Sequence, residues 1–444
     1  MPLKLEDLTR LRIIHIAGTK GKGSTCAFAE SLLRANSTWT AGRALRTGLY
    51  TSPHLIHPEE RVRLDSTPIS QQQFADYFFE IYPKLPQLHT PINSAKSDVP
   101  TRGPRNLQLY FLLALHIFLR EKVDVAIIET HSGGEYDATN FVPKPLVAAV
   151  TTLGMDHIAM LGPTIEDIAW HKAGIFKPQA VALSAEQDDP GAARVLESRA
   201  RDATSMKLGF VGVDPRISSL AATGVEALRP DVQKKNASLA VAIVEEWLAR
   251  SYPKAEKKRI SEDDIKKGIE QCSWPGRFQI LQRGPETWFL DAAHNEMSID
   301  VAAQWFAEMS REYDKGTPAH ETSPTRILIF SHVNELRDPV ALLHALASAL
   351  QIHNTPIDHL ILTHARAHGT GDLEIDFAVL RRAWNDVQAQ TEIWEEPRIE
   401  RALAVAREAG KEREGRRHVL ITGSQHLVGP VLQVLQDGDA DKAA

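Results

Sequence analysis

The residues whose types and spacing are best suited to chemistry lie near the amino terminus, in "HIAGTKGKGSTCAF", His15 to Phe28. Three glycines and two lysines occupy the six positions from Gly18 to Gly23. An apolar run precedes this stretch and a helical pattern follows it, which predicts a strand, a glycine turn and a helix. In that geometry backbone N–H groups and the positive end of the helix can bind phosphate. The stretch is therefore a candidate phosphate-binding loop.

This loop departs from the strict pattern G-x-x-x-x-G-K-[ST]. Ile16 takes the place of the first glycine, and Gly23 separates Lys22 from Ser24. The alternative is a plain glycine-rich turn between a strand and a helix. If the loop binds phosphate, Lys22 reaches the terminal phosphates, and the hydroxyl of Ser24 or Thr25 helps to hold Mg²⁺. Gly23 would then let the backbone approach the ligand closely.

Polar residues also follow other strand-like runs. Glu129 ends "VDVAIIE", Asp156 and His157 follow "VAAVTTLG", and "SPHL", which begins at Ser52, follows "TGLY". Ligands of open α/β sheets bind at the carboxyl ends of strands. A buried carboxylate there is costly unless it is paired or binds a metal, and Mg²⁺ prefers oxygen ligands. A lone histidine is more often structural, but polar groups at three strand ends favour a binding site.

Strand-like and helical segments alternate along the chain. The apolar runs lack polar alternation, which is typical of strands buried on both faces of a parallel sheet. The predicted strands are Leu11–Ala17, Val123–Glu129, Leu146–Thr152, Arg326–Phe330, His359–Thr363 and His418–Thr422. A 3.6-residue period predicts helices over Asn106–Arg120, Thr164–Ala173 and Lys234–Ala249. The pattern predicts an α/β fold.

A break in this series predicts two domains. The turn signals Pro275-Gly276 and Gly284-Pro285 lie close together, and a new α/β series follows them. A chain of 444 residues is also too long for one ordinary core. We expect an N-terminal domain over 1–273 with a P-loop-type, mostly parallel sheet flanked by helices. A linker over 274–279 would join it to a smaller, Rossmann-like α/β domain over 280–444.

The composition excludes several classes of partner. Lys and Arg number 51 against 57 Asp and Glu, a formal charge of −6, so no basic excess exists to bind nucleic acid or an anionic membrane. No run of about 18 apolar residues predicts a membrane span. The two cysteines, Cys26 and Cys272, cannot form a disulfide framework, and no signal peptide is evident. We expect a cytoplasmic protein that acts on small molecules.

Nine motifs in order along the chain resemble folylpolyglutamate synthases, most closely the eukaryotic type. They are "GTKGKGSTCAF", "TSPHL", "ERVRLD", "GGEYDATN", "LGMDHIAMLGPTIEDIAWHKAGIFKP", "SWPGR", "LDAAHN", "RDP" and "TGSQHLVG". Each motif alone is weak, but nine in order over nearly the whole chain are specific. This family belongs to the Mur-ligase-like ATP-dependent amide synthases. The resemblance implies that the opening loop is the family's own variant of the phosphate loop.

The resemblance also implies a reaction. ATP phosphorylates the side-chain carboxylate of the terminal glutamate of a folate, and the amine of free L-glutamate attacks the acyl phosphate. ADP and phosphate leave. The implied cofactors are ATP and Mg²⁺, the implied partners are ATP, L-glutamate and a folate or related carboxylate, and we expect a monomer. A mitochondrial form is also compatible with the family. Such chemistry needs charge neutralisation and positioning more than a covalent protein nucleophile.

Family analogy assigns roles to individual residues. Those implied for ATP are Gly18, Thr19, Gly21, Lys22, Gly23, Ser24, Thr25, Asn236, Arg277, Asp291 and His294. Those implied for Mg²⁺ are Ser24, Ser52, Glu129 and His157. The implied catalytic residues are Lys22, His157 and Lys172.

Some of these roles carry a structural expectation or an alternative. Lys172 matches the lysine that the family carbamylates. We expect Glu129 and His157 to end adjacent strands and to share one Mg²⁺ with Ser52. Asn236 would contact the adenine, and ATP would lie between the domains. Arg277 could instead be a surface residue of the linker, and Asp291 could cap the helix that follows it.

The chain departs from the family pattern at several positions. Where the family reads E-V-G-[IL]-G-G, this chain reads "ETHSGG", with Thr130 and His131. His131 can alter metal or substrate preference, or it can lie harmlessly on the surface. Ala292 replaces a glycine in "LDAAHN", and "RNLQLYFLLAL" differs from the family's segment before the long helix. Few residues precede the first predicted strand, where relatives carry a longer helical segment that helps to cover the folate.

These departures leave the choice of acceptor open. The ATP and Mg²⁺ residues match the family more closely than the folate-facing segments do. The leading hypothesis is a folylpolyglutamate synthase. The first alternative is the same ligase chemistry on another acceptor, such as dihydropteroate or a carboxylic acid of a specialised pathway. The second is a paralogue that binds nucleotide without ligating.

Overall fold

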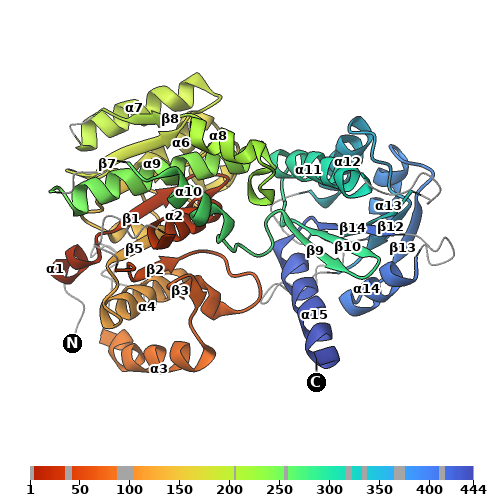
Figure 1. Ribbon diagram of the computed structural model, residues 1–444, viewed down its shortest axis with the longest axis horizontal. Helices are drawn as coiled ribbons and strands as arrows, with labels where there is room; N and C mark the ends of the chain where they lie inside the picture. The colour runs from red at the N-terminus through yellow and green to blue at the C-terminus, as the bar shows by residue number, and fades with distance from the viewer. Residues whose placement is uncertain are drawn as a thin grey trace, which may run out of the picture. The chain divides into compact units, whose positions relative to one another are not determined.

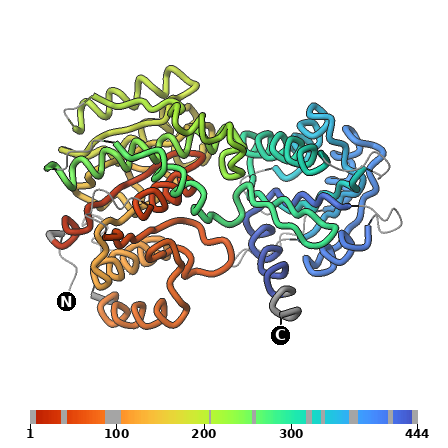
Figure 2. The backbone as a smooth tube through the Cα atoms, in the orientation of Figure 1, coloured from red at the N-terminus to blue at the C-terminus, as the bar shows by residue number. Residues whose placement is uncertain are grey.

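The computed structural model describes residues 5–35, 43–87, 104–204, 207–254, 259–315, 323–332, 338–364, 376–409 and 416–443. The chain divides into two compact units, with the division between Ser273 and Trp274 (Figure 1). Figure 2 traces the backbone of each unit. Among the described residues no helix is long and apolar enough to cross a membrane, and Cys26 and Cys272 are both free thiols.

Unit 1 is built on a mostly parallel sheet with the strand order β4-β3-β2-β5-β1-β6-β7-β8. The strands are β1 Ile14–Ala17, β2 Thr47–Tyr50, β3 Val62–Leu64, β4 Thr67–Pro68, β5 Val125–Glu129, β6 Val147–Val150, β7 Val181–Ala185 and β8 Gly209–Val211. β3 and β4 form an antiparallel hairpin at one edge, whereas the other strands run parallel. The first strand of the chain therefore lies in the middle of the sheet.

Helices cover this sheet. They are α1 Leu5–Leu8, α2 Lys22–Ala35, α3 Gln71–Ile81, α4 Asn106–Arg120, α5 Ile158–Leu161, α6 Ile165–Ala173, α7 Pro190–Thr204, α8 Pro215–Ala222, α9 Asp231–Ser251 and α10 Glu262–Glu270. Short 3₁₀ turns are η1 Thr9–Leu11, η2 Pro58–Arg61, η3 Tyr82–Gln87, η4 Ala138–Phe141 and η5 Glu226–Leu228. α2 packs against α9 and α10, and α4 packs against β2 with α3 beside it.

Unit 2 contains a second sheet with the strand order β13-β12-β11-β14-β10-β9. Its strands are β9 Gln279–Arg283, β10 Glu286–Leu290, β11 Thr325–Phe330, β12 His359–Leu362, β13 Glu392–Glu395 and β14 Arg417–Thr422. β9 is antiparallel and the other strands are parallel. The helices are α11 Glu296–Asp314, α12 Pro339–Ile352, α13 Phe377–Asn385, α14 Ile399–Glu408 and α15 Gln425–Ala443. The predicted α/β fold is confirmed.

Local sequence explains where several elements begin and end. α4 has the predicted bounds, Asn106–Arg120. α6 begins one residue later than predicted because Thr164 is its N-cap, with the Thr164 side chain accepting a hydrogen bond from the Asp167 N–H. The predicted strands of unit 1 start one to three residues too early, because an apolar run shows burial and not the extent of strand pairing, whereas those of unit 2 start within one residue of β11, β12 and β14. Leu11, for example, is buried in a 3₁₀ turn before β1.

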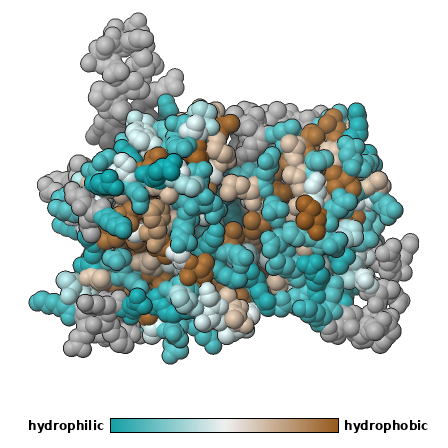
Figure 3. Space-filling model, turned by 90° about the horizontal axis from the view of Figure 1, so that it is seen from above, coloured by the Kyte–Doolittle hydropathy of each residue, from teal (hydrophilic) through white to brown (hydrophobic). Residues whose placement is uncertain are grey.

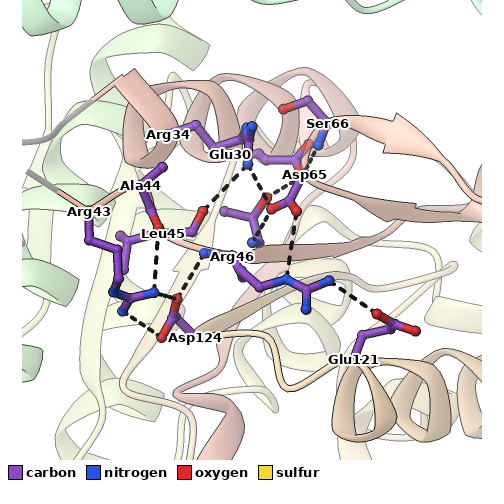
Figure 4. A network of polar contacts seen from close by, with 11 residues as sticks. Glu30, Arg34, Arg43, Ala44, Leu45, Arg46, Asp65, Ser66, Glu121 and Asp124 are labelled. Atoms are coloured by element: carbon purple, nitrogen blue, oxygen red, sulfur yellow. Dashed lines mark hydrogen bonds and ion pairs between the residues drawn. The ribbon is translucent and has the colours of Figure 1, made fainter.

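A polar network fixes the amino ends of β2 and β5 (Figure 4). Asp124, just before β5, accepts hydrogen bonds from Arg43 Nη1 and Nη2 at 2.8 and 2.9 Å, and from the Arg46 N–H at 2.8 Å. Arg34, on α2, donates to Asp65 at 2.7 Å, and Asp65 also accepts from the N–H of the first β2 residue. This network sets the register of the two strands whose opposite ends carry Ser52 and Glu129.

Replacing Asp124 with Asn should weaken this frame and leave the chemistry intact. Burial raises the pKa of Asp124, but the Arg43 and Arg46 contacts outweigh it, so the net pKa is lowered. A lowered pKa contributes stability above the ordinary value, and that contribution is lost as the pH falls through the folded-state pKa. Asp124→Asn should therefore cost about 1–2 kcal/mol at pH 7 and less in acid, as measured by urea unfolding.

The matched control is Asp231→Asn. Asp231 is largely exposed and pairs with Lys234 three residues later on α9. Such a pair contributes at most about 0.5 kcal/mol. Equal losses of unfolding free energy in both variants would show that the network contributes no more than an ordinary surface pair.

Candidate active site

The predicted phosphate loop has the expected strand–turn–helix geometry. β1 ends at Ala17 and α2 begins at Lys22. Gly18 has φ +149° and Gly21 has φ +85°, which L side chains rarely adopt. A Cβ at Gly18 would lie 1.8 Å from Thr151 Oγ1, and one at Gly21 would lie 2.1 Å from Asn236 Oδ1. Both positions therefore require glycine because of backbone conformation and close packing together.

The loop is held on the segment that follows β6. The N–H groups of Thr19 and Lys20 donate to the Thr152 carbonyl at 3.0 and 3.2 Å. Thr19 Oγ1 also donates to the Gly154 carbonyl at 3.1 Å, and Thr151 Oγ1 donates to the Lys20 carbonyl at 2.6 Å. The side chain of Thr19 thus anchors the loop to the protein.

The first turn of α2 presents hydroxyl and ammonium groups. Lys22 is partly exposed, whereas Ser24 and Thr25 are buried. Thr25 Oγ1 is buried and has no hydrogen-bond partner among the described residues. A buried polar group without a partner is costly, and this one lies where a helix N-terminus favours an anion. These groups fit a phosphate and a hard cation bound to it.

Glu129 and Ser52 meet as the sequence predicts. β2 and β5 are parallel neighbours, and the Ser52 N–H donates to Glu129 Oε2 at 3.1 Å. Glu129 is 6% exposed. Ser52 Oγ accepts a hydrogen bond from Arg61 Nη1 at 2.7 Å, and this guanidinium also stacks over Tyr110. A carboxylate and a hydroxyl at one strand edge are donors that suit Mg²⁺.

The expectation that Glu129 and His157 end adjacent strands is wrong. Glu129 ends β5 and His157 follows β6, but β1 lies between these two strands. His157 is exposed, has φ +52° and precedes α5. The neighbouring Asp156 pairs with Lys20 at 3.7 Å. The two predicted metal ligands therefore lie on opposite sides of the strand that carries the phosphate loop, because order along the chain does not determine order in a parallel sheet.

Lys172 is buried against the phosphate loop. This residue of α6 is 2% exposed, and its Nζ donates to the Gly18 carbonyl at 2.9 Å and to the Ser132 carbonyl at 3.5 Å. Burial, followed by the charge of Lys22, lowers its pKa to about 7. A substantial fraction of this amine is therefore neutral at physiological pH.

Asn236, a residue of α9, packs against the phosphate loop. Its Nδ2 donates to Gln233 Oε1 at 2.9 Å, and its Oδ1 faces Gly21. Asn236 is 7% exposed. The side chain thus packs directly on the phosphate loop.

The predicted residues of unit 2 gather around the end of β10. Asp291 Oδ2 accepts the Phe278 N–H at 3.0 Å, and His294 Nδ1 lies 2.8 Å from the Ala292 carbonyl oxygen. Asn295, and not Asp291, caps α11, so the capping alternative for Asp291 is wrong. Arg277 is partly buried and donates to the Gly276 carbonyl at 3.0 Å, so it is not a freely exposed linker side chain.

Large apolar side chains are exposed on the segments that follow β5 and β6. They are Tyr136, Phe141, Met155, Ile158 and Met160, and Trp170 of α6 is also partly exposed. On the face drawn in Figure 3, hydrophilic side chains dominate and hydrophobic ones lie in small groups between them. An exposed apolar group beside polar strand ends is suited to a ligand with both rings and charges.

Sequence reasoning missed two contributors to this edge of the sheet. Arg61 belongs to the motif "ERVRLD", but its type alone did not show that it would bind Ser52 Oγ. The alternative of a harmless surface position for His131 is wrong, because its side chain is 4% exposed and contacts Tyr50 and Asp137. The apolar "TGLY" before Ser52 could have indicated that Tyr50 needs a buried polar partner.

Comparison with known proteins identifies the family of the chain. The folylpolyglutamate synthase of Neurospora crassa is 38% identical over 98% of this chain and 83% of its own length. The chain belongs to the folylpolyglutamate synthase family. The mitochondrial folylpolyglutamate synthase of Homo sapiens is 34% identical over 89% of this chain and 69% of its own. No protein-family model matches the chain.

Solved structures of this family have the same fold. The Mycobacterium tuberculosis folylpolyglutamate synthase complexed with ADP and AMPPCP superposes with a TM-score of 0.72 at 25% identity. The match covers 97% of this chain and 95% of the solved chain. The fold and the family predicted from the nine motifs are therefore confirmed.

The glycine cradle can be tested with Gly21→Ala. The added methyl group would collide with Asn236 and would force an unfavourable φ, so we expect nucleotide affinity to fall at least about tenfold. Isothermal titration with ADP measures this directly.

Gly284→Ala is the matched control. Gly284 also has a positive φ, but nothing lies within 4 Å of its Cβ position. This variant should lose about 1–2 kcal/mol of stability from backbone strain while keeping its ADP affinity. An unchanged ADP affinity in folded Gly21→Ala would refute the cradle.

Proposed function

We propose that this ATP-dependent ligase adds L-glutamate to the γ-carboxylate of a folate through an acyl phosphate. The observation that carries the proposal is the glycine cradle at the end of β1, with Glu129 on one side and the buried amine of Lys172 against it. The named activity of the relatives, at up to 38% identity, supports the substrate assignment.

The proposed reaction has two steps. A carboxylate oxygen of the acceptor attacks the γ-phosphorus of ATP, the bond to the bridging β–γ oxygen breaks, and ADP leaves. The neutral amine of L-glutamate then attacks the acyl carbon, phosphate leaves, and the amine nitrogen loses a proton. Lys22 and the N–H groups at the start of α2 would stabilise the charge on the transferred phosphoryl group.

The same edge of the sheet supplies the ligands for Mg²⁺. We assign Ser24, Ser52, Glu129 and His157 to this role, of which Ser52 and Glu129 are in contact. Bound Mg²⁺ would neutralise phosphate charge and lower the barrier to transfer. The unpartnered hydroxyl of Thr25 and the buried carboxylate of Glu129 are the observations that favour a bound anion and cation here.

Lys172 is proposed to carry a carbamate. A neutral amine can attack CO₂, form an N–C bond and release one proton. The low pKa of Lys172, about 7, supports this reaction because the neutral amine is abundant near neutral pH. The product is an anion that would balance the positive charge of Lys22. ¹³C NMR in ¹³C-bicarbonate should show a carbamate signal that Lys172→Met lacks.

The remaining assignments follow the family. We propose that Asn236 contacts the adenine, and that unit 2 supplies Arg277, Asp291 and His294 to ATP. Unit 1 would be the ATPase domain, 274–279 the linker and 280–444 the ligase domain. The exposed apolar groups after β5 and β6 favour an acceptor with aromatic rings. We further propose a cytoplasmic monomer that acts on small molecules and binds no nucleic acid.

One assay tests the function. ADP release is measured with Mg²⁺-ATP and L-glutamate and with tetrahydrofolate, dihydropteroate or no acceptor. Turnover with tetrahydrofolate, and with neither dihydropteroate nor the acceptor-free mixture, supports the proposal. Turnover with dihydropteroate alone makes the protein a dihydrofolate synthase, and no acceptor-dependent turnover makes it a nucleotide-binding paralogue.

Lys22→Ala should abolish ATP turnover while the protein stays folded. A partly exposed lysine contributes little to stability, but loss of one preorganised charge contact lowers the rate by about 10²–10³-fold or more. Lys266→Ala, at an exposed position of α10, is the control and should keep full turnover. Full turnover by folded Lys22→Ala would contradict the role of the loop.

Lys172→Met should change how stability depends on pH. In the folded wild type the pKa is about 7, against 10.5 for the unfolded chain, so the unfolded chain binds more protons between these values. The cost of burying the ammonium is present in full below pH 7 and is relieved as the pH rises. In CO₂-free buffer the stability of the variant relative to wild type should fall by about 2–3 kcal/mol from pH 6 to pH 9, as measured by urea unfolding. A pH-independent difference would show that Lys172 has an ordinary pKa.

A further inference from the structure

His131 occupies a position that the proposed reaction does not explain. It lies two residues after Glu129, in the turn that follows β5, and its side chain is only 4% exposed. Its ring Nε2 lies 2.8 Å from the hydroxyl oxygen of Tyr50, and its Nδ1 lies 3.1 Å from Asp137 Oδ1. Nε2 therefore has a hydrogen-bond partner, whereas Nδ1 lies close to the Asp137 carboxylate without an aligned hydrogen bond.

Asp137 holds this turn as an anion. Its Oδ2 accepts the N–H groups of His131, Ser132 and Gly133 at 2.9, 3.0 and 3.4 Å. Its Oδ1 accepts the N–H and the hydroxyl of Thr139 at 3.0 and 2.8 Å. Burial raises the pKa of Asp137, but the hydrogen bonds from His131 and Thr139 outweigh it and lower the pKa well below its usual range.

Tyr50 forms the other end of the connection. It is the last residue of β2 and is fully buried. Its hydroxyl lies within hydrogen-bond distance of the imidazole. The two rings also meet edge to face, with centroids 5.7 Å apart. This contact joins the end of β2 to the turn after β5.

A second contact joins the same two segments two residues beyond the end of β2. The Ser52 N–H donates to Glu129 Oε2, while the hydroxyl of Tyr50 meets the ring of His131. The chain from Tyr50 to Ser52, the chain from Glu129 to His131 and these two contacts form a closed ring. A closed ring restricts the rotation of the Glu129 carboxylate more than either contact alone, because moving one segment strains both.

We propose that His131 is a positioning residue, which fixes the Glu129 carboxylate beside Ser52 for a divalent cation. This inference rests on the proposed function, which assigns Glu129 and Ser52 to Mg²⁺. The bond to Tyr50 transmits the constraint, and Asp137 holds the backbone of the turn that carries the imidazole. Partners that orient a metal ligand typically change metal affinity about 10–100-fold when they are removed.

The test is a double-mutant cycle of Tyr50→Phe and His131→Phe. Both substitutions keep an aromatic ring and remove the polar contact. The Mg²⁺ response is read as the rise in melting temperature with Mg²⁺ and ADP relative to ADP alone, and as the binding of Mn²⁺ followed by EPR. Each single variant should raise the half-saturating cation concentration about tenfold, and the double variant should be no worse than His131→Phe. Turnover at saturating Mg²⁺ should change much less than the KM for Mg²⁺.

The Tyr77→Phe variant is the control that separates a general loss of stability from a loss of cation affinity. Tyr77 also donates its hydroxyl to a carboxylate of unit 1, that of Glu121, near the amino end of β5. This variant should lower the melting temperature without changing cation affinity. If a single variant at the ring fails to fold, the double variant still decides the question, because it leaves neither the phenol nor the imidazole buried without its partner.

The outcomes separate this inference from the proposed function. Wild-type cation affinity in the ring variants, or additive losses in the double variant, overturns the role of His131 alone. A wild type without any Mg²⁺ response overturns the assigned metal site and this inference together. A tenfold, non-additive loss confined to the ring variants supports both.

Discussion

The candidate site depends on one steric constraint at the end of β1. The backbone at Gly18 and Gly21 lies so close to Thr151 and Asn236 that no side chain fits at either glycine. This closeness requires β1 to lie next to β6 and requires α9 to cover the loop. On the other side of β1, β5 and β2 bring Glu129 and Ser52 to the same edge of the sheet.

Electrostatics at this edge is arranged around buried groups of opposite sign. Lys172 is buried beside the phosphate loop, and the positive charge of Lys22 lowers its pKa further. Glu129 and Asp137 have buried side chains on the side of β5. Burial penalises each charged form, so every one of these groups has a partner or a shifted pKa. The site is therefore costly to the folded state before any ligand binds, and a nucleotide that contributes negative charge relieves part of the cost around the lysines.

Much of this arrangement was predictable from local sequence. The glycine loop, the apolar strands and the amphipathic α4 each have a signature within a few residues. Glu129 and Ser52 could be assigned because Glu129 ends one strand and Ser52 comes two residues after the end of another. The strand order could not, since nothing local to β6 indicates that β1 separates it from β5. The burial of His131 was equally hidden, because it depends on Tyr50 and Asp137, which lie far from it or beyond a turn in the sequence.

The two ends of the β2–β5 pair are held by charges in different surroundings. At the amino ends, the arginine and aspartate pairs are substantially exposed to solvent, as in the pair of Arg43 with Asp124. At the carboxyl ends, Tyr50 and Glu129 of the ring are buried. Dissolved ions screen exposed pairs over about 10 Å at 0.1 M and screen buried ones far less. Ionic strength therefore acts more on the amino-end pairs than on the carboxyl ends, so the contact between Ser52 and Glu129 is insulated from changes in salt that loosen the opposite edge of the same strands.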